Sequence, residues 1–125
     1  MMTYLAVALG GALGAMSRYW LYNSWSKLAE NPFPYITLFV NVIGSLLIGI
    51  VFVLLVERGE LGLEWRNVIN VGFLGAFTTF STFSLDALGL FEQGQIAMAL
   101  VYILSSVLVC ILAAWLGITL TRLIF

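Results

Sequence analysis

Four long apolar stretches, separated by short polar segments, cover almost the whole chain. They run over residues 3–24, 34–56, 67–90 and 93–121. Each is long enough to cross a bilayer as a helix, because about 20 mostly apolar residues span the hydrocarbon core. No basic segment precedes the first stretch, so we expect a retained helix there, not a cleaved signal peptide. The pattern predicts an all-α membrane protein with four transmembrane helices, folded as one domain over residues 1–125.

The composition supports a membrane protein and excludes several other classes. Hydrophobic residues make up 62% of the chain and charged residues only 9%, whereas soluble domains carry about 25% charged residues. Histidine is absent, which excludes histidine acid–base chemistry and histidine metal sites. The net charge of −1 lacks the basic character that nucleic acid requires. We therefore expect the lipid bilayer as a partner, no nucleic acid and no enzymatic activity.

The basic residues are almost evenly divided between the two sides of the predicted membrane. Both termini and the middle connection share one side, which holds Arg58, Arg66 and Arg122. The other side holds Lys27 and, if its head reaches outward, Arg18. A bias in basic residues normally sets orientation. Two interpretations of the balance stay open: chance in a short protein, or insertion in both orientations with formation of an antiparallel dimer.

Small residues recur three or four positions apart in the first two stretches. Gly10 and Gly14 lie in the first, and Ser45 and Gly49, with Gly44 beside them, in the second. Such spacing lets helix backbones approach closely in lipid. It predicts tight packing, either within one chain or between chains.

Neutral polar side chains outnumber ionisable ones inside the stretches. Asp86 is the only carboxylate there, and it lies late in the third stretch. Asn41 brings two N–H donors, which suit an anion, although a hydrogen bond between helices explains it equally well. Tyr102, Ser105 and Ser106 add hydroxyls in the fourth stretch. This inventory favours a pathway made of neutral donors over one that depends on fixed charge.

The segment GAFTTFSTFS, residues 75–84, combines five hydroxyl side chains with Phe80 and Phe83 between them. In a regular helix, the two phenylalanines form one row with hydroxyl rows beside it. Bonding of Ser and Thr to their own helix explains one or two of these hydroxyls, but not five. Successive β-branched threonines disfavour a helix. A break here would free carbonyls for a cation, and N–H groups and positively polarised ring edges for an anion.

Three segments together resemble the Fluc (CrcB) family of fluoride channels. They are GGALGAMSRY at 10–19, TLFVNVIGS at 37–45 and GAFTTFSTFS at 75–84, in this order on successive stretches. The length and the four-span layout agree over essentially the whole chain. The TTFSTF segment with an upstream VN-x-x-G is the most specific part of the resemblance.

The resemblance implies a fluoride-selective channel that exports fluoride passively and so relieves fluoride toxicity. It implies an antiparallel dual-topology homodimer in a cell membrane, the bacterial inner membrane, with the third helix broken near its middle. A structural Na⁺ at the dimer centre is implied, held by the backbone carbonyls of Gly75 and Thr78. Arg18 would either attract anions at a mouth or anchor the helix end. The implied pathway residues are Asn41, Phe80, Phe83, Thr79, Ser81, Thr82, Tyr102 and Ser106.

The fourth stretch departs from the family pattern at one position. The family has Tyr, Ser and Ser spaced by four, and here that spacing gives Tyr102, Ser106 and Cys110. A thiol is a weak hydrogen-bond donor, so the far end of this polar track differs from the family's.

Two other classes share some of these features. A small dual-topology multidrug exporter has the size and the balanced charge, but it needs a carboxylate deep in its first span, and residues 3–17 contain none. A non-transporting scaffold that dimerises through its glycine faces would leave Asn41 and the hydroxyls of residues 78–84 without a role.

Overall fold

The computed structural model describes residues 2–59 and 62–125, and within these ranges every regular element is a helix. Residues 60–61 of the predicted charged connection lie outside the described part. The elements are α1 (Met2–Ser24), α2 (Ser26–Ala29), α3 (Tyr35–Val51), the π-helical η1 (Phe52–Glu57), α4 (Leu63–Arg66), the π-helical η2 (Asn67–Leu74), α5 (Gly75–Phe77), α6 (Phe80–Glu92) and α7 (Ile96–Ile124).

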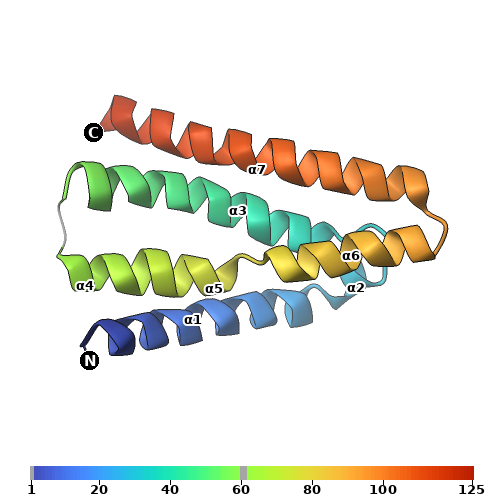
Figure 1. The fold of residues 1–125 in the computed structure, drawn as a ribbon, viewed down its shortest axis with the longest axis horizontal. Coiled ribbons are helices and arrows are strands. Elements are labelled where there is room, and N and C mark those ends of the chain that lie inside the picture. The colour runs from blue at the N-terminus through green and yellow to red at the C-terminus, as the bar shows by residue number, and fades with distance from the viewer. Residues whose placement is uncertain (1, 60–61) are drawn as a thin grey trace.

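The helices form four rods that lie side by side (Figure 1). One rod is α1, the second is α3 with η1, the third runs from α4 to α6, and the fourth is α7. The start of α1 and the end of α7 lie at the same end of the molecule as the end of η1 and the start of α4. The fourth rod begins at Ile96, later than predicted, because Gly94 adopts a positive φ of 78° in the preceding turn.

Three of the rods are long and apolar enough to cross a membrane. They are Tyr35–Glu57 with 23 residues, Leu63–Glu92 with 30 and Ile96–Ile124 with 29. This agrees with three of the four predicted spans and makes the chain a multi-pass membrane protein. The α1 helix also has 23 residues, but it includes polar positions such as Arg18 and Asn23. Its membrane crossing stays a prediction.

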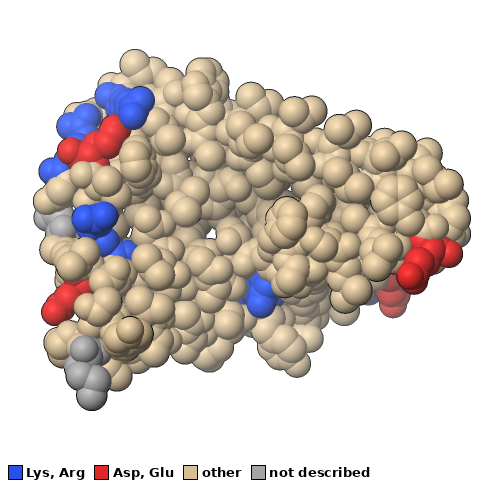
Figure 2. Space-filling view, viewed as in Figure 1, with Lys and Arg blue, Asp and Glu red and all other residues tan. Residues whose placement is uncertain are grey.

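The charged side chains are distributed as a membrane-spanning bundle requires. Figure 2 shows one face of the molecule, on which most acidic and basic groups lie at the two ends and the surface between them carries a basic group. At one end, Arg122 Nη2 lies 2.6 Å from Glu57 Oε1, which joins the last turn of α7 to the end of η1. The charged ends of the second and fourth rods therefore lie side by side.

The third rod is interrupted between α5 and α6. Thr78 has φ −81° and ψ 158°, and Thr79 has φ −152° and ψ 120°, so both residues are extended. The predicted break near the middle of the third span is present in the structure. The prediction that Thr79 and Thr82 form one row of a regular helix is therefore wrong. Thr79 precedes α6 and caps its first turn.

Glycines bring α1 against η2. A Cβ at Gly10 would overlap the carbonyl oxygen of Val68, and one at Gly14 would overlap the carbonyl oxygen of Phe73. Only glycine permits this backbone contact, so these two positions of the first stretch serve packing within the chain.

The α3 and α7 helices approach each other in the same way. A Cβ at Gly49 would overlap the carbonyl oxygen of Ala114, and a Cβ at Gly117 would overlap that of Leu46. The glycine spacing thus has an explanation inside one chain, which removes the main reason for assigning these faces to a dimer contact.

Replacing Gly14 by alanine is expected to destabilise the bundle. The added methyl group cannot fit without moving the η2 backbone, and overpacking typically costs about 1–3 kcal/mol. Thermal unfolding of the purified protein in detergent measures the effect. Gly11→Ala is the matched control, because its Cβ would have its nearest neighbour, the Gly72 oxygen, at 4.0 Å. Equal melting temperatures for the two variants would contradict this account of the α1 contact.

Candidate functional site

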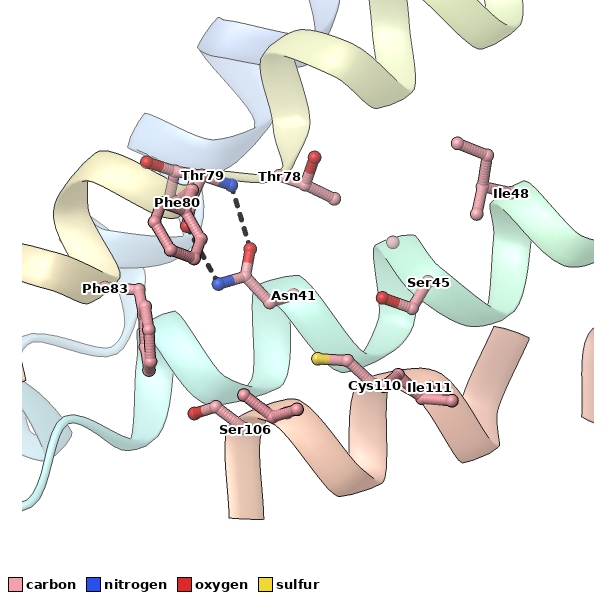
Figure 3. A pocket seen from close by; sticks show the side chains of 12 residues that line it. Asn41, Ser45, Ile48, Thr78, Thr79, Phe80, Phe83, Ser106, Cys110 and Ile111 are labelled. Carbon is pink, nitrogen blue, oxygen red and sulfur yellow. Dashed lines mark hydrogen bonds between the residues drawn. The ribbon is translucent and has the colours of Figure 1, made fainter. Parts of the chain in front are cut away.

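Asn41 of α3 is hydrogen-bonded to the backbone at the break in the third rod. Its Nδ2 donates to the Thr79 carbonyl at 2.9 Å, and the Thr79 N–H donates to Asn41 Oδ1 at 2.8 Å (Figure 3). The side-chain amide thus satisfies both backbone groups of a residue that has left the helix, as a break at bilayer depth requires. Because a primary amide has two N–H donors, this pairing leaves one of them available. Asn41 therefore joins α3 to the third rod, and one N–H of its amide remains free.

Two backbone carbonyls at the break lose their usual helical partners. The Thr79 N–H would bond to the carbonyl of Gly75 in a continuous helix, but it donates to Asn41 instead. The Thr82 N–H would bond to the carbonyl of Thr78, but it donates to Thr79 Oγ1 at 3.2 Å. Gly75 and Thr78 are the two residues that sequence resemblance connects with Na⁺. Hard cations prefer oxygen ligands, including backbone carbonyls, so these two carbonyl oxygens are suitable ligands for Na⁺.

A cavity of about 330 Å³ opens between α3, the break, α6 and α7. Figure 3 shows the side chains that line it. Five predicted pathway residues are among them: Asn41, Thr79, Phe80, Phe83 and Ser106. The others are Gly44, Ser45, Ile48, Thr78, Val107, Cys110 and Ile111. Ser81, Thr82 and Tyr102 do not line this cavity.

Ser106 is the unsatisfied polar group of this site. Its side-chain oxygen is buried and has no hydrogen-bond partner in the described part of the chain. A buried hydroxyl without a partner is costly, and such groups are uncommon in native structures. Its neighbour Ser105 bonds to the Val101 carbonyl of its own helix at 2.6 Å. Of the two serines, only Ser106 therefore offers a free donor to an occupant of the cavity.

Phe80 and Phe83 lie together at the start of α6. Their ring centroids are 5.4 Å apart, with the planes inclined at 48°. Phe83 is buried, and its ring also lies 5.1 Å from that of Tyr102. Phe80 is 77% exposed. Both residues line the cavity, and the edge of a phenyl ring carries a positive partial charge that can face an anion.

Tyr102 belongs to a second polar cluster. It is fully buried, and its hydroxyl donates to Asp86 Oδ2 at 3.3 Å. Thr37 donates to the same oxygen at 2.8 Å and is itself hydrogen-bonded to the hydroxyl of Tyr22. The cluster joins four rods and holds the carboxylate of the third stretch with neutral donors. Sequence reasoning missed Thr37 and Tyr22, although a single carboxylate inside an apolar stretch signals that partners must exist.

The remaining predicted residues do not line the cavity. Ser81 Oγ is 3.4 Å from Thr79 Oγ1, at the edge of hydrogen bonding. Arg18 lies half-buried on α1, which contributes no residue to the cavity. Among residues 2–59 and 62–125, Arg18 makes no salt bridge. Ser45 also lines the cavity and was not predicted as a pathway residue, since its position shows only when α3 and α7 are packed. Cys110, the position at which the fourth stretch departs from the family pattern, lines the cavity as well.

The fold and the site together define a multi-pass helical membrane protein in which a largely apolar cavity with a few polar groups lies beside an interrupted helix. The family described as CrcB-like protein, Camphor Resistance (CrcB), matches residues 5–118. The chain belongs to this family, and the resemblance seen in the sequence is confirmed.

Curated relatives are 46–53% identical to the chain over the aligned residues. A protein of Hahella chejuensis named "Fluoride-specific ion channel FluC" is 53% identical over 118 residues, covering 94% of this chain and 93% of the relative. One of Saccharophagus degradans with the same name is 49% identical over 119 residues, covering 95% and 89%. One of Methylococcus capsulatus is 46% identical over 121 residues, covering 97% of this chain. The chain spans about half (53%) of that last relative's length.

Proposed function

We propose that this protein is a fluoride-selective ion channel through which fluoride leaves the cell passively, so that fluoride toxicity is relieved. The observation that carries the proposal is the cavity at the break, which several neutral groups line: the Asn41 amide, the unpaired Ser106 hydroxyl and the rings of Phe80 and Phe83. Relatives bearing the name "Fluoride-specific ion channel FluC" support it. The protein acts as a conduit in the cell membrane and needs no enzymatic step.

The donor chemistry suits fluoride. Fluoride is small and strongly hydrated, so a pore must replace its water with several close donors and still release the ion, as conduction requires. Hydroxyls, an amide and ring edges can do this without a fixed positive charge. Tyr102 extends the track beyond Phe83, whose ring it contacts. Ser81 and Thr82 supply hydroxyls near the break, and Arg18 attracts anions toward the pathway.

We infer that two copies assemble antiparallel, with α1 as the fourth span of each. The high exposure of Phe80, a pathway residue, leaves one side of the site uncovered in a single chain. The even division of basic residues permits insertion in both orientations.

Reporter fusions at the C-terminus are expected to give signal on both sides of the membrane. A phosphatase active only outside the cytoplasm and a fluorescent protein active only inside serve as the pair. Adding three lysines after Phe125 should shift the population to one side, because basic residues favour the cytoplasm. A signal on one side alone for the unmodified chain would exclude dual topology.

The carbonyls of Gly75 and Thr78 would hold a Na⁺ ion at the centre of the dimer, contributed by both copies. The N–H groups that would pair with these carbonyls in a continuous helix bond to side chains instead, which supports this assignment. A bound cation would offset the partial negative charge of the freed carbonyls, which otherwise disfavours an anion nearby. The ion is structural in this proposal and carries no step of transport.

Removing Na⁺ is expected to lower the stability of the protein. A ligand that binds only the folded state stabilises it by about 2.7 kcal/mol at a concentration 100 times its dissociation constant. In a series at constant ionic strength, with N-methylglucamine as the balancing cation, the melting temperature should therefore rise with the logarithm of the Na⁺ concentration. Equal melting temperatures with and without Na⁺ would remove the sodium site from the proposal.

Anion efflux from liposomes that contain the purified protein tests the function directly. Fluoride and chloride electrodes, used side by side, should record rapid fluoride release with chloride retained. Absence of fluoride release with Na⁺ on both sides would overturn the channel proposal and leave the exporter or the scaffold. Neither has support from the site, since residues 2–17 of α1 carry no carboxylate and the Gly10, Gly14, Gly49 and Gly117 positions pack within the chain.

A further inference from the structure

The single thiol of the chain lies on the wall of the cavity. Cys110 is the only cysteine, and its side chain is half-buried. It stands on α7 one turn after Ser106, and both residues line the cavity. Figure 3 shows Cys110 and Ser45 on facing sides of α7 and α3. Any chemistry directed at thiols therefore acts at one position, beside the break.

A second observation indicates that this part of the cavity receives an occupant. The Ser106 side chain is 6% exposed, lines the same cavity and leaves its oxygen without a partner. Ser105 and Thr121 of α7 instead bond to carbonyls of that helix. The hydroxyl beside Cys110 is thus available to a ligand.

We propose that Cys110 makes the cavity a binding site for soft, thiol-seeking metal cations, and that such a cation blocks the ion path. The inference rests on the proposed channel function. Sulfur ligands select soft metals, whereas the oxygen and amide groups around Cys110 do not compete for them. With mercuric chloride, the Cys110 sulfur bonds to mercury, one chloride leaves, and the thiol proton goes to solvent. The product, S–Hg–Cl, fills space that a permeating anion would occupy.

Mercuric chloride added to fluoride-loaded liposomes provides the test. Fluoride efflux should fall at least about 10-fold, equivalent to about 1.4 kcal/mol in barrier height, and dithiothreitol should restore it. Each variant is compared with its own efflux before the reagent, so that differences in basal rate do not enter. Intact-mass measurement of the protein recovered from the same liposomes counts the mercury bound per chain.

Three variants locate the effect. Cys110→Ser should bind no mercury and show unchanged efflux after the reagent. Ser106→Cys with Cys110→Ser moves the thiol one turn along the same wall and should restore the block. Leu108→Cys with Cys110→Ser places the thiol on a 59% exposed position outside the cavity. It should take up mercury without a block.

The outcomes separate this inference from the proposed function. Efflux absent before the reagent would refute the channel, while mercury uptake would still report whether water reaches Cys110. Normal efflux in the presence of one bound mercury per chain would show that Cys110 lies off the path. Failure of the membrane-embedded protein to bind mercury, when the denatured protein binds one, would show that no such site exists. Either of the last two results overturns the proposal.

Discussion

Replacing Asn41 by leucine is expected to reduce fluoride efflux about 100-fold, equivalent to about 2.7 kcal/mol in barrier height. Leucine has a similar volume but cannot pair with the N–H and carbonyl of Thr79. Each backbone group left unsatisfied in an apolar setting costs about 1–3 kcal/mol. The extended conformation at Thr79 then loses its support, and the cavity loses an amide donor at the same time.

Two comparisons separate these contributions. Asn41→Asp keeps an acceptor for the Thr79 N–H but places a carboxylate where a donor faced the Thr79 carbonyl, so efflux should also fall. Asn23→Leu, on an exposed position near the end of α1, controls for the loss of an amide elsewhere and should leave efflux within about two-fold, as surface changes usually shift energies by less than about 0.5 kcal/mol. Normal efflux in Asn41→Leu, with the protein folded, would disprove the central role of this residue.

Replacing Phe83 by isoleucine is expected to lower fluoride efflux at least about 10-fold, or about 1.4 kcal/mol in barrier height. The phenyl ring lies at the cavity wall, close to the rings of Phe80 and Tyr102. Isoleucine fills much of the space but has no positively polarised edge to face an anion. Liposome efflux and the melting temperature, measured on the same preparation, show whether transport falls more than stability does.

Phe91→Ile is the matched control for this substitution. Phe91 lies on the same helix, two turns further, at 39% exposure and outside the cavity. Its replacement should leave efflux unchanged. If Phe83→Ile and Phe91→Ile reduced efflux equally, the ring edge would have no special role, and general packing of α6 would explain both results.

Much of the site could be predicted from one segment of the sequence. The successive threonines at 78–79 disfavour a helix, and the break lies at these two residues. The same segment carries Phe80 and Phe83, so their position beside the break follows from their number. Asn41 could be identified as a polar group at depth, but its partner could not, because 38 residues separate it from Thr79.

Other parts of the site required the packed structure. Tyr102 and Ser106 stand one turn apart on α7 and looked equivalent in the sequence. In the structure, Tyr102 bonds to Asp86, whereas Ser106 has no partner and lines the cavity. Periodicity places residues on a helix face, but it does not state which neighbouring helix that face meets.

The order of residues along the chain was enough to identify a helical membrane protein, to locate its long apolar helices and to place the break in the third. These properties depend on local composition and on backbone preferences, which each segment carries alone. Three further features required the packed molecule: glycines pack α1 on η2 and α3 on α7, Asn41 bonds to the backbone at the break, and Ser45 and Cys110 line one cavity. These contacts depend on the rotation and depth of each helix relative to its neighbours. Such quantities are set by the simultaneous packing of side chains from segments that are far apart in the chain.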